Sequence, residues 1–192
     1  FFFREPAHFD FLAEQVLPAR RAGGNLRVWS AASSSGEEAY SIAMLLMEHL
    51  GPAQPWQVFG SDISVATVAQ AQAGIYRTQR IEQMPAGYLQ RYCLRGIGRD
   101  EGTLRIKDDV VARVRFAPIN LNGPLPDIGT FDVIFLRNVL IYFDAPTRRQ
   151  VIERLVRRLA SAGWLFIGHS ESLGDAAFFH EDAEFNSSVG RN

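Results

Sequence analysis

Hydrophobic residues recur along the chain in two patterns: short apolar runs and longer stretches with helical spacing. The runs predict β-strands at residues 26–32, 56–60, 114–119, 131–138 and 164–170. The helical spacing predicts helices at residues 6–17, 36–50, 64–73, 85–92 and 145–162. Because strands and helices alternate, we predict an α/β fold with a parallel, doubly wound sheet and helices on both faces.

One segment breaks this alternation. Residues 92–110 contain two β-like runs around a loop with Gly96, Gly98 and Gly102. Glycines between two short strands are typical of a hairpin, so we predict a small antiparallel β insertion at residues 91–113. With 192 residues and 47% hydrophobic content, the chain has the size of one domain, residues 1–192.

The stretch RVWSAASSSGEEAYSIAMLL, residues 27–46, combines a strand, a small-residue loop and a helix. Such a loop places unpaired N–H groups of the helix beside a pocket. Its single Gly36, the acids Glu37 and Glu38, and the absence of Lys or Arg from residue 28 to residue 50 argue against a phosphate ligand. A cationic, hydroxyl-rich ligand such as S-adenosylmethionine (SAM) fits better. Alternatively, the two acids only complement the helix dipole.

Other polar residues follow the predicted strands. Ligands of open α/β sheets bind outside the carboxyl ends of the strands, where Asp62, Asn120-Leu121 and Arg137-Asn138 are expected to meet the loop. A carboxylate after the second strand can accept hydrogen bonds from both ribose hydroxyls. Asp62 could instead cap the helix that begins near Ser64.

Charge and cysteine content narrow the class of protein. The net charge of −1 provides no basic field for nucleic acid or an anionic membrane. The single cysteine, Cys93, excludes an intrachain disulfide, and the histidines lack metal-ligand spacing. No apolar run reaches the roughly 18 residues of a membrane span. We therefore expect a cytoplasmic protein without metal, nucleic-acid partner or membrane insertion.

Several collinear motifs resemble the chemotaxis receptor methyltransferase family, the protein-glutamate O-methyltransferases of CheR type. They cover about residues 1–173 and read FFFREPAHF, RVWSAASSSGEEAYSIAM, GSDIS, GIYR, LQRY, IFLRNVLIYFD and LFIGHSESL. The resemblance implies a Rossmann-like SAM-dependent methyltransferase fold. It also implies methyl transfer to glutamate side chains of chemoreceptors, with S-adenosylhomocysteine as the second product.

The resemblance further implies roles for eight residues. Cofactor contacts are implied for Arg4, Glu38, Asp62, Asn120, Leu121, Arg137 and Asn138. Arg4 and Tyr142 are implied as catalytic: Arg4 would orient the glutamate or the cofactor carboxylate, and Tyr142 would lie near the transferred methyl group. Without the family, the residues alone favour a surface arginine at position 4 and a core aromatic at position 142. The sequence leaves open whether Glu37 or Glu38 faces the ligand.

The chain also departs from the family pattern. The family's N-terminal helical, receptor-binding domain and the Asn and Thr before the Phe pair are absent, and residues 178–192 do not resemble its closing β-hairpin. We therefore expect a catalytic-domain fragment, monomeric, that keeps the cofactor fold but binds receptor poorly. The loop at residues 96–102 resembles one that docks on the receptor's C-terminal peptide; a structural flap is the alternative.

Three rival functions have distinct sequence requirements. A module that senses SAM without catalysis is the strongest, because the substrate-recognition part is missing. A nicotinamide-dependent oxidoreductase is disfavoured by the single glycine and paired acids of the first loop. A nucleic-acid methyltransferase would need a basic groove and a base-flipping pocket. Methyl transfer to glutamate needs neither base nor metal, since a free glutamate, with a pKa near 4.3, is ionised at pH 7.

Overall fold

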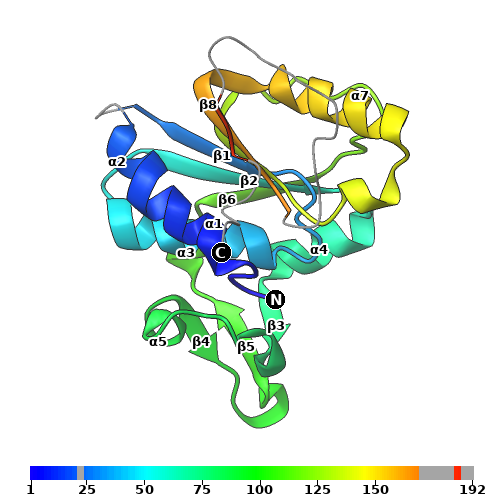
Figure 1. Cartoon of the computed structure of the whole chain (residues 1–192). Helices are drawn as coiled ribbons and strands as arrows, with labels where there is room; N and C mark the ends of the chain where they lie inside the picture. The colour runs from blue at the N-terminus through cyan, green and yellow to red at the C-terminus, as the bar shows by residue number, and fades with distance from the viewer. Residues whose placement is uncertain (21–23, 169–183, 187–192) are drawn as a thin grey trace.

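A parallel six-stranded sheet forms the centre of the protein in the computed structural model, which describes residues 1–20, 24–168 and 184–186 (Figure 1). In spatial order the strands are β6 (Val114–Pro118), β2 (Trp56–Asp62), β1 (Leu26–Ser30), β7 (Phe131–Leu136), β8 (Leu159–Ile167) and β9 (Glu184–Asn186). Every neighbouring pair is parallel. The predicted Rossmann-like α/β fold is confirmed.

Side chains alternate between the two faces of this sheet, as the period of a strand requires. Val28 of β1 and Val133 of β7 pack into one core with α3 (Glu37–Leu50). Trp29 and Ile134, their neighbours along the chain, pack into a second core with α7 (Ala145–Val156). α4 (Val65–Ala73) lies on the same side as α3, and α7 covers the opposite face (Figure 1). Both faces are therefore buried, which explains the continuous apolar runs.

The N-terminal helix packs on the α3 side. It runs without a break through α1 (Pro6–Phe11), one π-helical turn (Leu12–Val16) and α2 (Leu17–Ala19), which confirms the prediction for residues 6–17. Phe9 stacks on Phe135 of β7 with ring centroids 6.1 Å apart, and Phe11 contacts Trp164 of β8 at 5.2 Å. These aromatic contacts hold the chain start beside the central strands.

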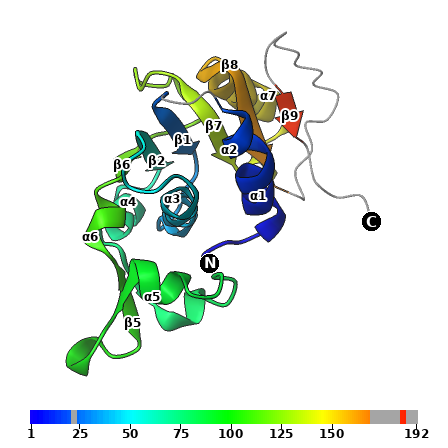
Figure 2. The same cartoon turned by 90° about the vertical axis from the view of Figure 1, so that its left-hand side faces the viewer.

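A second, antiparallel sheet lies beside the first (Figure 2). Its strands, in spatial order, are β3 (Ile75–Arg77), β5 (Thr103–Ile106) and β4 (Cys93–Arg95). Short helices flank them: η2 (Thr78–Arg80), α5 (Tyr88–Tyr92), η3 (Gly98–Asp100) and α6 (Asp108–Val111). The predicted hairpin is present, but β3 also belongs to this sheet and lies outside residues 91–113. The helix predicted at 85–92 is limited to α5.

The C-terminal half contains one confirmed boundary and one error. Asp144 caps α7 as predicted, because its side chain accepts a hydrogen bond from the Thr147 backbone N–H at 2.9 Å. The helix does not continue to residue 162: it ends at Val156, and Leu159 begins β8. The predictions for His169 and His180, and all but residues 184–186 of those past Gly174, lie outside the described residues.

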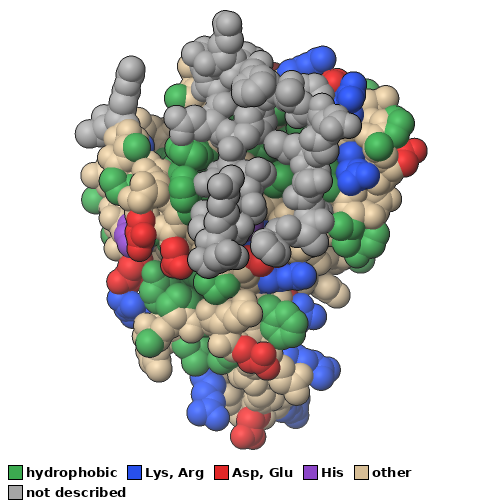
Figure 3. Space-filling model, in the orientation of Figure 1, with side chains coloured by type: hydrophobic (Ala, Val, Ile, Leu, Met, Phe, Trp, Pro, Cys, Tyr) green, Lys and Arg blue, Asp and Glu red, His purple; other side chains and the backbone are tan. Residues whose placement is uncertain are grey.

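Charged side chains of both signs are interspersed on the face shown in Figure 3, in keeping with the net charge of −1. Among the described helices, none combines the length and apolar character needed to cross a membrane.

Candidate functional site

A cavity of about 480 Å³ opens at the carboxyl ends of the central strands. Its volume lies within the roughly 300 to 1,000 Å³ typical of small-molecule sites. Six of the predicted site residues line it: Arg4, Glu38, Asp62, Arg137, Asn138 and Tyr142. Phe1, Phe9, Ala32, Ser33, Ser34, Ser35, Glu37, Arg80 and Val139 complete the lining. The structure thus brings together five segments of the chain, at residues 1–9, 32–38, 62, 80 and 137–142.

The loop between β1 and α3 forms the floor of this cavity, and Asp62 holds it in place. One carboxylate oxygen of Asp62 accepts a hydrogen bond from the Ser34 backbone N–H, and the other accepts one from the Ser64 N–H, each at 3.0 Å. Ser64, rather than Asp62, provides the side-chain cap of α4, by accepting from the Thr67 N–H at 3.2 Å. Asp62 therefore both shapes the loop and borders the cavity.

Glycine is required at the end of the same loop. Gly36 has a φ of 95°, and a Cβ atom there would lie 2.8 Å from the Cβ of Ala71 and 3.0 Å from the Tyr76 hydroxyl. Any other residue would be strained in its backbone and would collide with α4. Gly36 thus sets the direction in which α3 leaves the loop.

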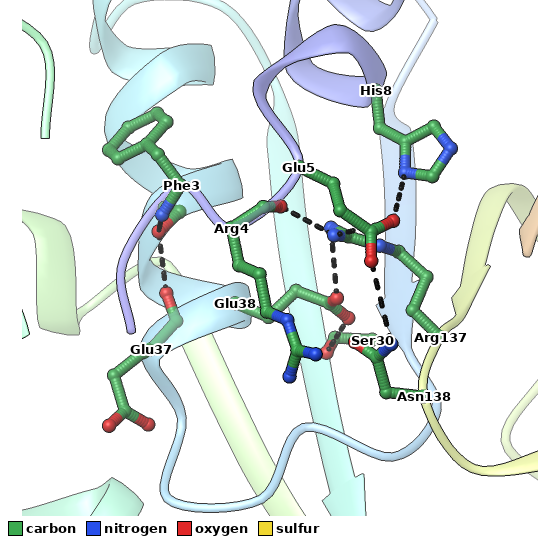
Figure 4. Close-up of polar contacts among 10 residues, drawn as sticks. Phe3, Arg4, Glu5, His8, Ser30, Glu37, Glu38, Arg137 and Asn138 are labelled. Carbon is green, nitrogen blue, oxygen red and sulfur yellow. Dashed lines mark hydrogen bonds and ion pairs between the residues drawn. The ribbon is translucent and has the colours of Figure 1, made fainter. Parts of the chain in front are cut away.

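The two acids that open α3 point in different directions (Figure 4). Glu37 is buried, and its carboxylate accepts hydrogen bonds from Arg80 Nη1 at 2.5 Å and from the Ser35 hydroxyl at 2.6 Å. Glu38 instead accepts a hydrogen bond from the Ser30 hydroxyl at 2.7 Å, and its second oxygen lies 3.3 Å from Arg137 Nη1. The sequence left open which of the two acids faces the ligand. In the structure, each acid belongs to a separate polar network.

Arg137 is the buried centre of the Glu38 network. Its Nη1 faces Glu38, its Nη2 lies 3.2 Å from Glu5 Oε2, and Nη2 also donates a hydrogen bond to the Arg4 carbonyl (Figure 4). Its side chain is 1% exposed. Removing such a charge from water is unfavourable unless opposite charges compensate it, as two carboxylates do here. Arg137 therefore ties the N-terminal segment to the end of β7.

The backbone around the cavity adopts an uncommon conformation at several positions. Five non-glycine residues of the described chain have positive φ, and four of them lie here: Phe3, Glu5, Ser34 and Asn138. The Phe3 N–H donates to Ser41 Oγ at 2.9 Å, and Asn138 Nδ2 donates to Glu5 Oε1 at 3.4 Å. Strained residues persist only where surrounding contacts hold them, and they cluster at functional sites.

Arg4 and Tyr142 present polar groups that the described chain does not engage. The Arg4 guanidinium has no hydrogen bond or ion pair within the described residues, and Figure 4 shows it extending beside Glu38. Tyr142 ends the short helix η4 (Leu140–Tyr142) and is 78% exposed. It is therefore not the core aromatic that the residues alone favoured. Both side chains can meet a ligand without first breaking an internal contact.

Asn120 and Leu121 do not line the cavity. Asn120 is exposed and accepts a hydrogen bond from the Asn122 N–H at 2.9 Å, while Leu121 is buried in the core beneath α7. Their turn still adjoins the cavity, because the Ile119 N–H donates to the Asp62 carbonyl at 2.9 Å. Their cofactor role remains a prediction.

Three residues of this region were not identified from the sequence. Arg80 lines the cavity from η2, a segment with no recognisable pattern. Glu5 belongs to the FFRE motif, but only the structure reveals its contact with Arg137. Ile63, 68% exposed, directly follows Asp62 but does not line the cavity, and its exposure could not be read from the sequence.

Within the described ranges, no three His, Cys, Asp or Glu side chains are grouped so that they could hold a metal ion. The cavity wall presents the carboxylates of Glu37, Glu38 and Asp62, the guanidinium groups of Arg4 and Arg80, and the exposed Tyr142 phenol.

Known proteins have similar sequences. Relatives include the "Chemotaxis protein methyltransferase" of Escherichia coli K12, 47% identical over 90% of this chain and 60% of that protein. "Chemotaxis protein methyltransferase 2" of Pseudomonas aeruginosa is 42% identical over 92% of this chain and 64% of that protein. The chain thus spans about three fifths of the length of these relatives.

One solved structure shares the fold of this chain, and one family description matches its sequence. The plantazolicin methyltransferase BpumL, solved with a desmethylPZN analog and SAH, shares the fold at a TM-score of 0.50 and 13% identity, over 84% of this chain and 44% of that one. The sequence description "CheR methyltransferase, SAM binding domain" matches residues 1–186. The chain therefore belongs to the CheR methyltransferase family, of which it carries the SAM-binding domain.

Proposed function

We propose that this chain transfers the methyl group of SAM to glutamate side chains of chemoreceptors and so forms glutamyl methyl esters. The observation that carries the proposal is the single cavity that combines the Glu38 and Asp62 carboxylates with the free Arg4 guanidinium and the exposed Tyr142. We further propose that it acts as a monomer in the cytoplasm, where the methylated region of such receptors lies.

The residues at the cavity fit the chemical groups of SAM. Asp62 and Glu38 offer oxygen acceptors for ribose hydroxyls and an ammonium group, and Arg4 offers a cation for a carboxylate. The exposed Ile63 offers an apolar surface to an adenine ring beside Asp62. The turn that contains Asn120 and Leu121 lies next to Asp62, because the Ile119 N–H donates to the Asp62 carbonyl. This position is compatible with their predicted cofactor role. Arg137 and Asn138 would support the site by fixing the N-terminal segment.

SAM, when bound, supplies a methyl group that carries a sulfonium leaving group. A glutamate oxygen forms the new bond to the methyl carbon while the carbon–sulfur bond breaks, and that electron pair stays on sulfur. No proton moves, because the glutamate is already ionised. The chain must therefore align the reacting atoms, and alignment can supply about 7 to 11 kcal/mol. We assign this task to Arg4 and Tyr142, which reach the cavity from positions far apart along the chain.

The antiparallel sheet has features of a docking site for a receptor tail peptide. β4 pairs only with β5 among the described strands, so one of its edges is open. Leu94 is half exposed and Ile97 is 84% exposed at this edge. An extended peptide could add a strand there and raise the local concentration of the receptor. Titration with receptor C-terminal peptides tests this; an absence of saturable binding favours the structural flap.

Two measurements test the proposed function. Calorimetric titration with SAM and with S-adenosylhomocysteine should show saturable binding of both. Transfer of a labelled methyl group should then be measured at high concentration of a receptor cytoplasmic fragment, because the chain spans only part of its relatives. Formation of a base-labile methyl ester supports the proposal. Binding without transfer would identify the alternative, a module that senses SAM without catalysis.

A further inference from the structure

Three arginines line the cavity: Arg137 is buried and paired with acids, and the other two, Arg4 and Arg80, are anchored differently. Arg4 is held through its backbone, because Arg137 donates to its carbonyl, and its guanidinium makes no hydrogen bond or ion pair with the described residues. Arg80 is held through its side chain, by Glu37. The Arg4 and Arg80 guanidinium groups therefore border the same cavity. Each belongs to a different polar network, Arg4 to that around Glu38 and Arg80 to that around Glu37.

The anchoring of Arg80 leaves part of its guanidinium available. Nη1 donates to Glu37 Oε1 at 2.5 Å, and within the described residues no other hydrogen bond of this guanidinium occurs. The Arg80 side chain is 49% exposed, whereas that of Glu37 is 5% exposed. The Arg80 carbonyl also accepts a hydrogen bond from the Phe2 N–H at 3.1 Å. Backbone and side chain are thus both fixed, while Nε and Nη2 remain able to donate.

The proposed reaction brings two carboxylates to this cavity: that of the SAM amino-acid group and that of the acceptor glutamate. Two like charges in a partly desolvated space repel, so each needs its own cation. Glu37 cannot bind either carboxylate, and it is already paired. A guanidinium suits a carboxylate because its donors match both oxygens.

We propose that Arg80 binds the carboxylate of the acceptor glutamate and that Arg4 binds that of the cofactor, which makes Arg80 a determinant of acceptor specificity. The assignment rests on the proposed function. Arg4 is fixed by the Arg137 network, which includes the cofactor residue Glu38. Arg80 follows β3 of the antiparallel sheet, the part of the chain proposed to meet the receptor. Glu37 then acts as a positioning residue for Arg80.

A double-mutant cycle tests this assignment. Two receptor fragments are compared, one with Glu and one with Gln at a single acceptor position, and the dissociation constant of each is measured in the presence of S-adenosylhomocysteine. The wild-type chain should prefer the Glu fragment by about tenfold. In Arg80→Gln this preference should fall to about onefold, while Arg80→Lys should keep part of it. Equal preference in wild type and Arg80→Gln overturns the assignment.

Further variants separate this effect from loss of structure. Glu37→Gln/Arg80→Gln removes both charges, so no unpaired buried carboxylate remains, and it should lose the preference like the single variant. Arg157→Gln, at an exposed position after α7, is the matched control and should retain it. The dissociation constant of S-adenosylhomocysteine should not change in Arg80→Gln; a tenfold rise would assign Arg80 to the cofactor instead and overturn the proposal. If the wild type transfers no methyl group, the proposed function fails, independently of the comparison between variants.

Discussion

Glu37 and Glu38 are consecutive residues with opposite surroundings, and the comparison shows how one helix end can serve two purposes. Glu38 faces Arg137, whose side chain is almost fully buried and also contacts Glu5. Glu37 faces Arg80, whose side chain is half exposed. In the Glu38 network, the Arg137 guanidinium is enclosed by two acids. In the Glu37 network, the carboxylate is enclosed and the Arg80 guanidinium reaches solvent.

This difference assigns different consequences to the two arginines. A buried charge that loses its partners destabilises the fold strongly, and Arg137 is such a charge, whereas the half-exposed Arg80 guanidinium stays in contact with water. Arg137 should therefore matter mainly for the shape of the site, and Arg80 mainly for what enters it. If substitution of Arg137 changed mainly what enters the site, and substitution of Arg80 mainly its shape, this assignment would be wrong.

The largest effect is expected for Arg137→Met. The substitution leaves the Glu5 and Glu38 carboxylates, both largely buried, without their cation, so the free energy of unfolding should fall by about 3 to 5 kcal/mol. Denaturant unfolding followed by circular dichroism measures it. The double variant Glu37→Gln/Arg80→Gln, which leaves no unpaired buried carboxylate, is the matched comparison and should lower the same quantity by about 1 kcal/mol or less. Equal losses in the two variants would show that both networks are structural.

Arg4→Ala should give the next largest effect, and on activity instead of stability. The guanidinium makes no hydrogen bond or ion pair in the described chain, so its loss should leave the unfolding free energy within about 0.5 kcal/mol of wild type. The rate of methyl transfer should fall about 100-fold, because a reacting group or the cofactor loses its orientation. Near-normal turnover would remove Arg4 from the catalytic assignment.

The strands of the parallel sheet could be predicted from the sequence more completely than those of the antiparallel sheet. Strands of the parallel sheet were predicted because their residues are buried on both faces and form apolar runs. In β3 only Tyr76 is buried, so no run marks this three-residue strand. The helix after Asp144 was extended too far because Leu159 continues the helical spacing of Val156, although Leu159 begins β8.

Residues within long motifs could be predicted as site residues from the sequence. Contacts between segments far apart along the chain could not. The motifs placed six residues that line one cavity. No local pattern could assign Glu37 to Arg80 or Glu38 to Arg137, since the partners lie 43 and 99 residues away along the chain. Which acid faces which arginine depends on how α3 leaves the loop at Gly36, a matter of backbone geometry.

Gly36→Ala tests that geometry for both networks at once. The new Cβ atom would lie 2.8 Å from that of Ala71, at a φ of 95°, so the unfolding free energy should fall by about 1 to 3 kcal/mol and SAM affinity should weaken. Gly51→Ala is the control: Gly51 also has positive φ, at 71°, but no atom lies within 4 Å of its added Cβ. It should lose a comparable amount, roughly 1 to 3 kcal/mol, through backbone strain alone, and bind SAM normally. Equal SAM affinity in both variants would show that Gly36 does not set the loop.

The smallest effect concerns a second link on the Glu37 side, between the far end of α3 and the antiparallel sheet. The Tyr92 hydroxyl donates to Glu48 Oε2 at 2.5 Å, and this hydrogen bond, followed by that from Arg91, lowers the pKa of Glu48 below its usual 4.5. Tyr92→Phe should lower the free energy of unfolding at pH 7 by about 1 kcal/mol. Urea unfolding at pH 7 and at pH 3 measures the difference.

The pH dependence of that difference has a defined sign. A carboxylate whose pKa is lower in the folded state contributes stability that is fully present above its unfolded pKa, here 4.5, and that is lost as the pH falls through the lower folded value. The gap between wild type and Tyr92→Phe should therefore shrink as the pH falls from 4.5 toward 3. Tyr88→Phe, which removes a hydroxyl with no hydrogen bond among the described residues, should show no such trend. A gap independent of pH would mean that Tyr92 acts through packing and not through its hydrogen bond to Glu48.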